Sequence, residues 1–274
     1  MTVTMADMSA NPPVARAEIP ARGCESCGGV GYVFAVGEDG YERVADCSCL
    51  DAGRWARAYN SARIPALMHG VTLESSDSRG GLTRTLYDWT LKVADEIVGV
   101  PSDTARRSGF TTVADAIQAG GLRQRRRAAT GWLLYGPTGT GKTHLMAGVA
   151  RACVDAGVPA LYVRWPDVVD SFRGSFGASA TVSKERIQSI TSAMSAATVL
   201  VVDELGAEIA TDYGRALAER WIGNRIESGR KVVIATNLST EDGSLRKHVT
   251  ARVWSRFASG LTAVKVGGKD RRSK

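Results

Sequence analysis

Long hydrophobic runs are missing from this chain of 274 residues. A helix that crosses a membrane needs about 20 consecutive apolar residues, whereas the apolar stretches here are short, as at residues 199–202. The first 23 residues also lack the continuous apolar segment of a secretory signal. We therefore expect a cytoplasmic protein that does not bind membranes, with a flexible N-terminus over residues 1–19.

Cysteine is scarce as well, with five in the chain. Without an export signal, a framework of disulfides is not expected. Cys153 stands alone in an apolar helical stretch, where we expect a buried small hydrophobe. The other four lie in two close pairs: Cys24, Cys27, Cys47 and Cys49.

The segment between the cysteine pairs predicts a β-hairpin. Residues 32–36 and 41–45 are rich in β-forming residues and are joined through GEDG. Closing the hairpin brings the four thiolates together, and four sulfurs can surround one Zn²⁺ tetrahedrally with no open position for catalysis. We predict a zinc-ribbon-like, partner-binding module at residues 20–52. Cytosolic thiols without a metal are the alternative.

Acidic residues are outnumbered, with 28 Asp and Glu against 35 Lys and Arg and a net charge of +7. The cations cluster in LRQRRR and in the tail VKVGGKDRRSK, and such clusters suit the phosphate backbone of nucleic acids. A solvated charge run is the alternative. The candidates for contact with single-stranded DNA are Arg123, Arg125, Arg126 and Arg127.

Residues 53–130 are predicted to form a helical linker that contains the arginine run. Apolar residues recur at helical spacing from Leu50 to Tyr59, and this pattern stops at Pro65. A second apolar stripe runs from Leu82 to Ile97. We interpret it as core packing.

Glycines are placed where a phosphate-binding loop needs them. The segment GPTGTGKTH satisfies the pattern GxxxxGKT between an apolar run and a helical stretch. Backbone N–H groups and the helix N-terminus hold the phosphates in such a loop, its lysine reaches the β- and γ-phosphates, and its threonine binds Mg²⁺. The predicted ATP ligands are Gly136, Pro137, Thr138, Gly139, Thr140, Gly141, Lys142, Thr143 and His144.

Two acids end a second apolar run, TVLVVDELG. Such a run is typical of a parallel strand that is buried on both faces. Asp203 would bind Mg²⁺ through water, and Glu204 would orient and deprotonate the attacking water. A pair of surface acids is the alternative. Because a kinase needs no water-activating carboxylate at this position, Glu204 favours a hydrolase.

A third run, KVVIATN, ends in Thr236 and Asn237. A polar side chain there can hydrogen-bond the γ-phosphate or the attacking water, although Asn is also an ordinary turn residue. The alternation of strands and helices predicts a doubly wound parallel α/β sheet over residues 131–274, with the ligand at the carboxyl ends of the strands.

In order, GPTGTGKTHLM, VLVVDELG, VVIATNLS and ARVWSRFASG resemble the AAA+ ATPases of the DnaC/IstB type, the helicase-loader and transposition-helper branch. The resemblance runs from about residue 131 to the C-terminus, and ARIPALMHGVTLE looks like the linker that precedes that core. It implies a Mg²⁺-dependent ATPase with the AAA+ P-loop fold and no full C-terminal lid. The cysteine module is similar to the zinc-binding N-terminal domains of helicase loaders.

The resemblance also assigns arginines. In such ATPases an arginine of the SRF-like box enters the site of the neighbouring subunit. Arg256 matches that position, and Arg252 is the second candidate. This role implies self-association, with the ATP site shared between subunits. A terminal sensor arginine falls in GGKDRR, where Arg272 fits best, Arg271 is second, and Asp270 stands where Ser is usual.

The implied function is a helicase loader that binds single-stranded DNA and delivers a hexameric replicative helicase at the initiation of DNA replication. An IstB-type transposition helper is the alternative, although a cysteine-rich module is not its usual companion. Glu204, Asn237 and Arg256 count against a metabolic P-loop kinase. A binding module with an inactive ATPase is disfavoured because every catalytic position is filled.

Overall fold

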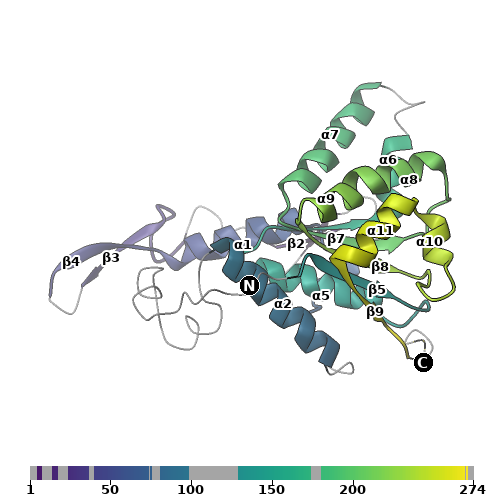
Figure 1. Cartoon of the computed structure of the whole chain (residues 1–274). Helices are drawn as coiled ribbons and strands as arrows, with labels where there is room; N and C mark the ends of the chain where they lie inside the picture. Colours follow the sequence, from purple (N-terminus) through teal and green to yellow (C-terminus); the bar gives the residue numbers. More distant parts are fainter. Residues whose placement is uncertain are drawn as a thin grey trace. The chain divides into compact units, whose positions relative to one another are not determined.

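The chain forms two compact units, Met1–Gly70 and Val71–Lys274 (Figure 1). The computed structural model describes residues 5–7, 14–17, 24–36, 40–73, 75, 81–98, 129–173, 180–268 and 270. Among these residues, no helix combines the length and the apolar character that crossing a bilayer requires.

The N-terminal unit contains the hairpin that the sequence predicts. Strands β3 (Tyr32–Val36) and β4 (Glu42–Asp46) pair antiparallel, with Phe34 opposite Val44. Helix α1 (Ser48–Ala62) follows at once, so that Cys47 is its N-cap and Cys49 lies in its first turn. Helix α1 thus begins inside the predicted cysteine module.

Helix α1 ends at Ala62, shortly before Pro65, where the sequence predicts the helical pattern to stop, and its C-cap Arg63 has a left-handed φ of 54°. A short 3₁₀ turn, η1 (Ala66–Met68), comes next. The face of α1 that carries Ala56 and Tyr59 is buried, and Trp55 stacks on Tyr59 with ring centroids 5.0 Å apart.

Part of the N-terminal segment, residues 1–19, is paired within this unit. Strand β1 (Met5–Asp7) pairs antiparallel with β2 (Val14–Arg16). The Ala17 N–H donates to the Asn60 side chain at 2.7 Å, and Asn60 Nδ2 donates back to the Ala17 carbonyl at 3.0 Å. This reciprocal pair holds residues 14–17 against the end of α1, an interaction across 43 positions that local composition does not reveal.

The C-terminal unit contains the predicted parallel sheet. Its five strands lie in the order β6-β7-β8-β5-β9, and every neighbouring pair is parallel. Continuous runs of Val, Ile and Leu bury the central strands on both faces, as expected for a sheet covered on two sides. The strands are β5 (Gly131–Tyr135), β6 (Ala160–Arg164), β7 (Val199–Leu205), β8 (Lys231–Thr236) and β9 (Leu261–Lys265).

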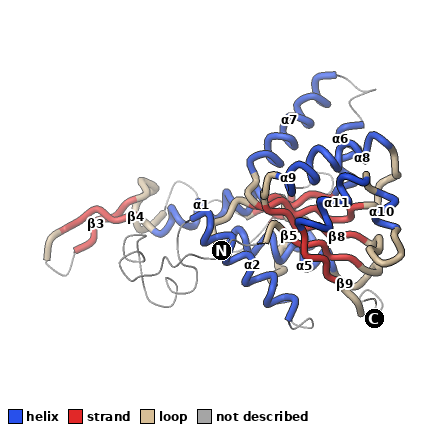
Figure 2. Tube along the Cα trace, in the orientation of Figure 1, coloured by secondary structure: helices blue, strands red, loops and turns tan. Residues whose placement is uncertain are grey.

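Helices cover both faces of this sheet, which makes the fold doubly wound. Figures 1 and 2 show α2 and α5 on one side, and α7, α9 and α11 on the other. The helices are α2 (Gly81–Val98), α5 (Lys142–Asp155), α6 (Trp165–Arg173), α7 (Ala180–Ala196), α8 (Asp212–Ala218), the π-helical turn η4 (Glu219–Gly223), α9 (Asn224–Glu227), α10 (Ser244–His248) and α11 (Ala251–Gly260).

Helix α2 belongs to the C-terminal unit, although the sequence places it in a linker. It packs on α5 through buried side chains that include Leu86 and Val93. Trp89 Nε1 donates to the Ala129 carbonyl at 2.9 Å. The C-terminal unit therefore begins well before residue 131, where the sequence predicts the ATPase core to start.

Candidate nucleotide site and cysteine cluster

The phosphate-binding loop connects β5 to α5 and depends on glycine at three positions. Gly136, Gly139 and Gly141 have φ values of 148°, 79° and 78°, a region that side chains disfavour. A Cβ on Gly136 would lie 2.3 Å from the Val266 carbonyl oxygen. The loop therefore needs glycine for its backbone path, and at Gly136 for space as well.

Lys142, the first residue of α5, is folded back onto this loop. Its Nζ donates to the carbonyls of Gly136 at 2.8 Å and Pro137 at 2.7 Å, and the residue is 7% exposed. Thr140 is also buried, and its hydroxyl donates to the Pro137 carbonyl at 2.9 Å. The Lys142 bonds hold an ammonium group beside the N-terminus of α5, and a cation beside a helix N-terminus is an arrangement that binds phosphate.

The side chains of Asp203 and Thr143 are hydrogen-bonded to each other. Asp203 is 2% exposed, and burial raises the pKa of its carboxyl group. Three donors oppose that effect: the Tyr162 hydroxyl at 2.6 Å, the Glu204 N–H at 2.9 Å and the Thr143 hydroxyl. A carboxylate and a hydroxyl in contact are oxygen ligands of the kind that Mg²⁺ prefers, so the residues present fit this ion.

Glu204 has a left-handed φ of 60°, unusual for a residue with a side chain. Its carboxylate accepts two hydrogen bonds from the Arg164 guanidinium, at 2.7 Å from Nη2 and 3.1 Å from Nε. Arg164 also pairs with Asp167 at 3.4 Å. The predicted water-activating acid is thus held by a cation that sequence reasoning missed.

Arg164 and Tyr162 both come from β6, the strand beside β7. The register pairs Arg164 with Asp203, and alternate residues of a strand point to the same face. The only signal in the sequence is that a tyrosine and an arginine stand two residues apart near the end of a predicted strand. Without knowledge of which strand is adjacent, that signal identifies no partner.

Asn237, the predicted sensor, follows directly after β8 and is exposed. The preceding Thr236 donates to the Leu205 carbonyl at 2.6 Å, and the register pairs these two residues. Because Leu205 follows Glu204, the ends of β7 and β8 are joined at this point. Asn237 therefore lies at the same edge of the sheet as the two acids.

The candidate trans-acting arginines lie on α11. Arg256 donates to Asn224 at 3.1 Å and pairs with Glu227, and its side chain is 15% exposed. The Arg252 side chain is 71% exposed and pairs with Glu219 at 2.8 Å. Arg252 lowers the pKa of Glu219. Both arginines are thus held by acids or amides of their own chain.

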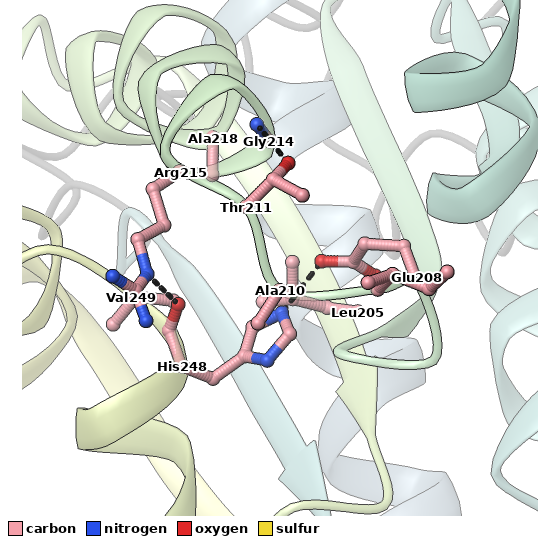
Figure 3. Close-up of a pocket in the computed structure, with 10 residues that line it drawn as sticks. Leu205, Glu208, Ala210, Thr211, Gly214, Arg215, Ala218, His248 and Val249 are labelled. Carbon is pink, nitrogen blue, oxygen red and sulfur yellow. Dashed lines mark hydrogen bonds and ion pairs between the residues drawn. The ribbon is translucent and has the colours of Figure 1, made fainter.

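A small pocket lies beyond the end of β7 (Figure 3). Within it Glu208 accepts from the Gly206 N–H at 2.9 Å and contacts His248 Nε2 at 2.7 Å. Arg215 donates to the His248 carbonyl at 3.1 Å. The pocket therefore connects the loop after Glu204 to α10. Sequence reasoning did not identify this connection.

Some predicted residues lie outside the part of the chain that the structure describes. They are Arg123, Arg125, Arg126, Arg127, Arg271 and Arg272. Asp270 is described, and its carboxylate lies against the phosphate-binding loop: a Cβ on Gly139 would be 2.1 Å from Asp270 Oδ1.

The four N-terminal cysteines converge as predicted, with all their sulfur atoms within 4.8 Å of one another. Cys24 and Cys47 are 3.6 Å apart at sulfur, as are Cys27 and Cys49. Tetrahedral zinc with Zn–S bonds of about 2.3 Å places its sulfurs about 3.8 Å apart, so this cluster fits Zn²⁺.

The backbone beside the first cysteine pair, Cys24 and Cys27, favours thiolates. Hydrogen bonds from the backbone at Ser26 and Cys27 lower the pKa of Cys24 to about 6. The Gly31 N–H donates to Cys27 Sγ at 3.3 Å and lowers the pKa of that thiol as well. Such N–H bonds to sulfur are what a structural zinc site uses to stabilise charged ligands.

Comparison with known proteins agrees with this site. Residues 122–251 match the family described as IstB-like ATP binding protein. The replicative helicase loader DnaC of Escherichia coli (strain K12) is 24% identical over 129 residues, 47% of this chain and 50% of DnaC. The chain thus spans about half the length of the first curated relatives it matches.

Two solved structures are similar to part of this chain. The DnaC helicase loader has 21% identity and a TM-score of 0.43, over 50% of this chain and 78% of that one. AMPPCP-bound DnaA from Aquifex aeolicus has 17% identity and a TM-score of 0.43, over 58% and 48%. Similarity at this level does not identify a function.

Proposed function

We propose that this chain is an ATP-dependent loader that delivers a hexameric replicative helicase to single-stranded DNA at the initiation of replication, on the basis of its similarity to IstB-like ATP-binding proteins and to DnaC. The observation that carries the proposal is a nucleotide site equipped for hydrolysis, in a DnaC-like core, on the same chain as a four-cysteine cluster. The core would hold ATP and DNA, and the cysteine module would hold the helicase.

The positions of the core residues support ATP hydrolysis. The loop N–H groups and the Lys142 ammonium would bind the phosphates, once Lys142 leaves the Gly136 and Pro137 carbonyls. Mg²⁺ bound at Thr143 and Asp203 would neutralise charge on the β- and γ-phosphates. Glu204, on leaving Arg164, would accept the proton of the attacking water, and Asn237 would hydrogen-bond that water or the γ-phosphate.

Assembly would complete the site. An arginine of α11, Arg256 or otherwise Arg252, would enter the site of the next subunit and stabilise charge in the transition state. Turnover would then depend on self-association, so that ATP hydrolysis reports the assembly state. Arg272 would act as the terminal sensor, and residues 123–127 would bind single-stranded DNA in the cytoplasm.

A transposition helper of the IstB type is the second candidate, because residues 122–251 match the family described as IstB-like ATP binding protein. It shares the ATPase core and differs in partner: a transposase and duplex target DNA in place of a helicase and single strands. The two functions therefore make different predictions for the same purified protein.

The test uses the purified replicative helicase of the same host and circular single-stranded DNA. The wild-type chain with ATP should place the helicase on the circle, as scored by helicase retained after gel filtration. Glu204→Gln should bind ATP and the helicase but lose turnover by at least about a hundredfold, because an amide cannot accept the proton. If the chain forms no helicase complex yet retains a transposase on duplex DNA, the second candidate is correct. If it does neither, both functions are wrong.

A further inference from the structure

The hairpin of the N-terminal unit holds large apolar side chains in solvent. Phe34, Val36 and Val44 are 68%, 66% and 65% exposed, and Tyr32 is 46% exposed. Single exposed apolar residues are ordinary, but a contiguous group of them marks a binding surface.

These four residues share one face of the hairpin. Residues 32, 34 and 36 alternate along β3 and therefore point to the same side. The register places Val44 opposite Phe34, where directly paired residues also share a side. The Tyr32 and Phe34 rings meet edge to face, with centroids 6.2 Å apart. We call Tyr32, Phe34, Val36 and Val44 the aromatic face.

Carboxylates lie at both ends of the aromatic face. Glu42 is opposite Val36, and Asp46 is opposite Tyr32. Residues 24–49 contain five acidic residues and one basic residue, in a chain whose net charge is +7. The cysteine module is thus an acidic segment of a basic protein.

We propose that the aromatic face is the docking surface for the helicase, and that it fits an apolar patch of that partner rimmed by Lys or Arg. This inference rests on the proposed function. Charge selects the occupant, because the carboxylates repel the phosphates of a nucleic acid. They also repel the same acidic face of a second copy, whereas a cationic rim is attracted to them.

The available area supports a protein occupant. Aromatic side chains bury about 150–250 Å² each when covered. The aromatic face offers two aromatic and two aliphatic side chains that are exposed. They could supply a large part of the roughly 800 Å² that each partner contributes to a standard interface.

The test compares two matched double variants of the full chain. The first, Phe34→Ser with Val44→Ser, changes the central pair of the aromatic face. The second, Ala35→Ser with Arg43→Lys, changes the next directly opposed pair, which lies on the other face and is also exposed, and keeps the charge of the hairpin. Zinc content and ATP affinity establish that each variant is folded.

We expect the first variant to bind the purified host helicase at least about tenfold more weakly, because aromatic anchors dominate interface energies. The second should bind like the wild type. A third variant, Glu42→Lys with Asp46→Lys, should also weaken binding and should invert its dependence on salt.

Four results would overturn this inference. If the first variant binds the helicase with unchanged affinity, the aromatic face is not the docking surface, and the proposed loader function is unaffected. Loss of DNA binding alone, or of self-association alone, assigns the face to another occupant. If the wild-type chain fails to bind the helicase, the loader function falls together with its docking surface.

Discussion

Replacing Lys142 with Met should have two separable effects, because the structure gives this side chain two environments. Without nucleotide, Nζ donates to the Gly136 and Pro137 carbonyls at 2.8 and 2.7 Å in a buried position. With ATP, the same ammonium is expected to bind the β- and γ-phosphates. The substitution should therefore weaken the empty core as well as abolish ATP binding.

The size of the first effect follows from the bonds lost. A hydrogen bond from a charged donor contributes about 1.5–3 kcal/mol, but burying the ammonium offsets part of this gain. A net loss of about 2 kcal/mol for the two bonds is expected, which lowers the Tm of a domain of about 200 residues by about 4–8 °C. ATP affinity should fall by at least about a hundredfold.

Lys231 provides a matched control. It is 6% exposed and pairs with Glu96 at 3.0 Å. It lies at the amino end of the central strand β8, opposite the strand ends that carry the phosphate-binding loop. Lys231→Met should destabilise the core to a similar extent and leave ATP affinity unchanged. Thermal melts with and without ATP, and titration calorimetry, measure both quantities. An unchanged Tm for Lys142→Met without nucleotide would refute the reasoning from the two carbonyl bonds, and retained ATP affinity would refute the assignment of the site.

Three further predictions concern other parts of the chain. Asp203→Asn should raise the Tm of the nucleotide-free protein near neutral pH while removing Mg²⁺-dependent ATP binding. Burial raises the pKa of this carboxyl group, so its ionised form lowers the stability of the fold above the unfolded pKa, and the neutral amide removes that cost. Thermal melts across pH test this, and a variant whose Tm depends on pH as the wild type's does would contradict it. Zinc should copurify at about one ion per chain, as measured by elemental analysis. Its removal by a chelator, or the substitution Cys47→Ser, should unfold the hairpin, as followed by circular dichroism, while ATP affinity is retained. A metal-free protein with an intact hairpin would exclude the zinc site. Converting Arg123, Arg125, Arg126 and Arg127 to Ala should weaken single-stranded DNA binding and flatten its salt dependence, and unchanged affinity excludes the arginine run as the contact surface.

Patterns that are local in sequence predicted the parts of the fold that local physics determines. The phosphate-binding loop follows from glycine spacing, and the parallel sheet from continuous apolar runs that only a doubly covered strand tolerates. The cysteine cluster follows from a hairpin whose closure returns Cys47 to Cys24. In each case a short segment contains the whole signal.

Contacts between distant segments were not predictable in the same way. The Arg164–Glu204 and Tyr162–Asp203 bonds join residues about 40 positions apart and depend on β6 lying beside β7 in one register. Glu208 meets His248 only because α10 follows β8, which is the next strand over. A sequence gives the residues of such pairs but not the strand order that joins them.

Variants of Arg256 and Arg252 test whether this ATPase hydrolyses ATP as a single chain or only in an assembly. Both lie on α11, but Arg252 is largely exposed whereas Arg256 is mostly buried against Asn224 and Glu227. Arg256→Ala should therefore lower the Tm, while Arg252→Ala should change the free energy of unfolding by less than about 1 kcal/mol.

If Arg256 acts in trans, Arg256→Ala should bind ATP normally and lose turnover on the order of a thousandfold. Mixing it with Glu204→Gln protein should restore part of that turnover, because some interfaces then combine an intact Glu204 with an intact Arg256. Rescue separates a trans role from simple destabilisation, since a weakened fold cannot be repaired by a second chain. The same loss and rescue with Arg252→Ala would transfer the role to Arg252, and full activity of both variants at every protein concentration would leave an ATPase that completes its site within one chain.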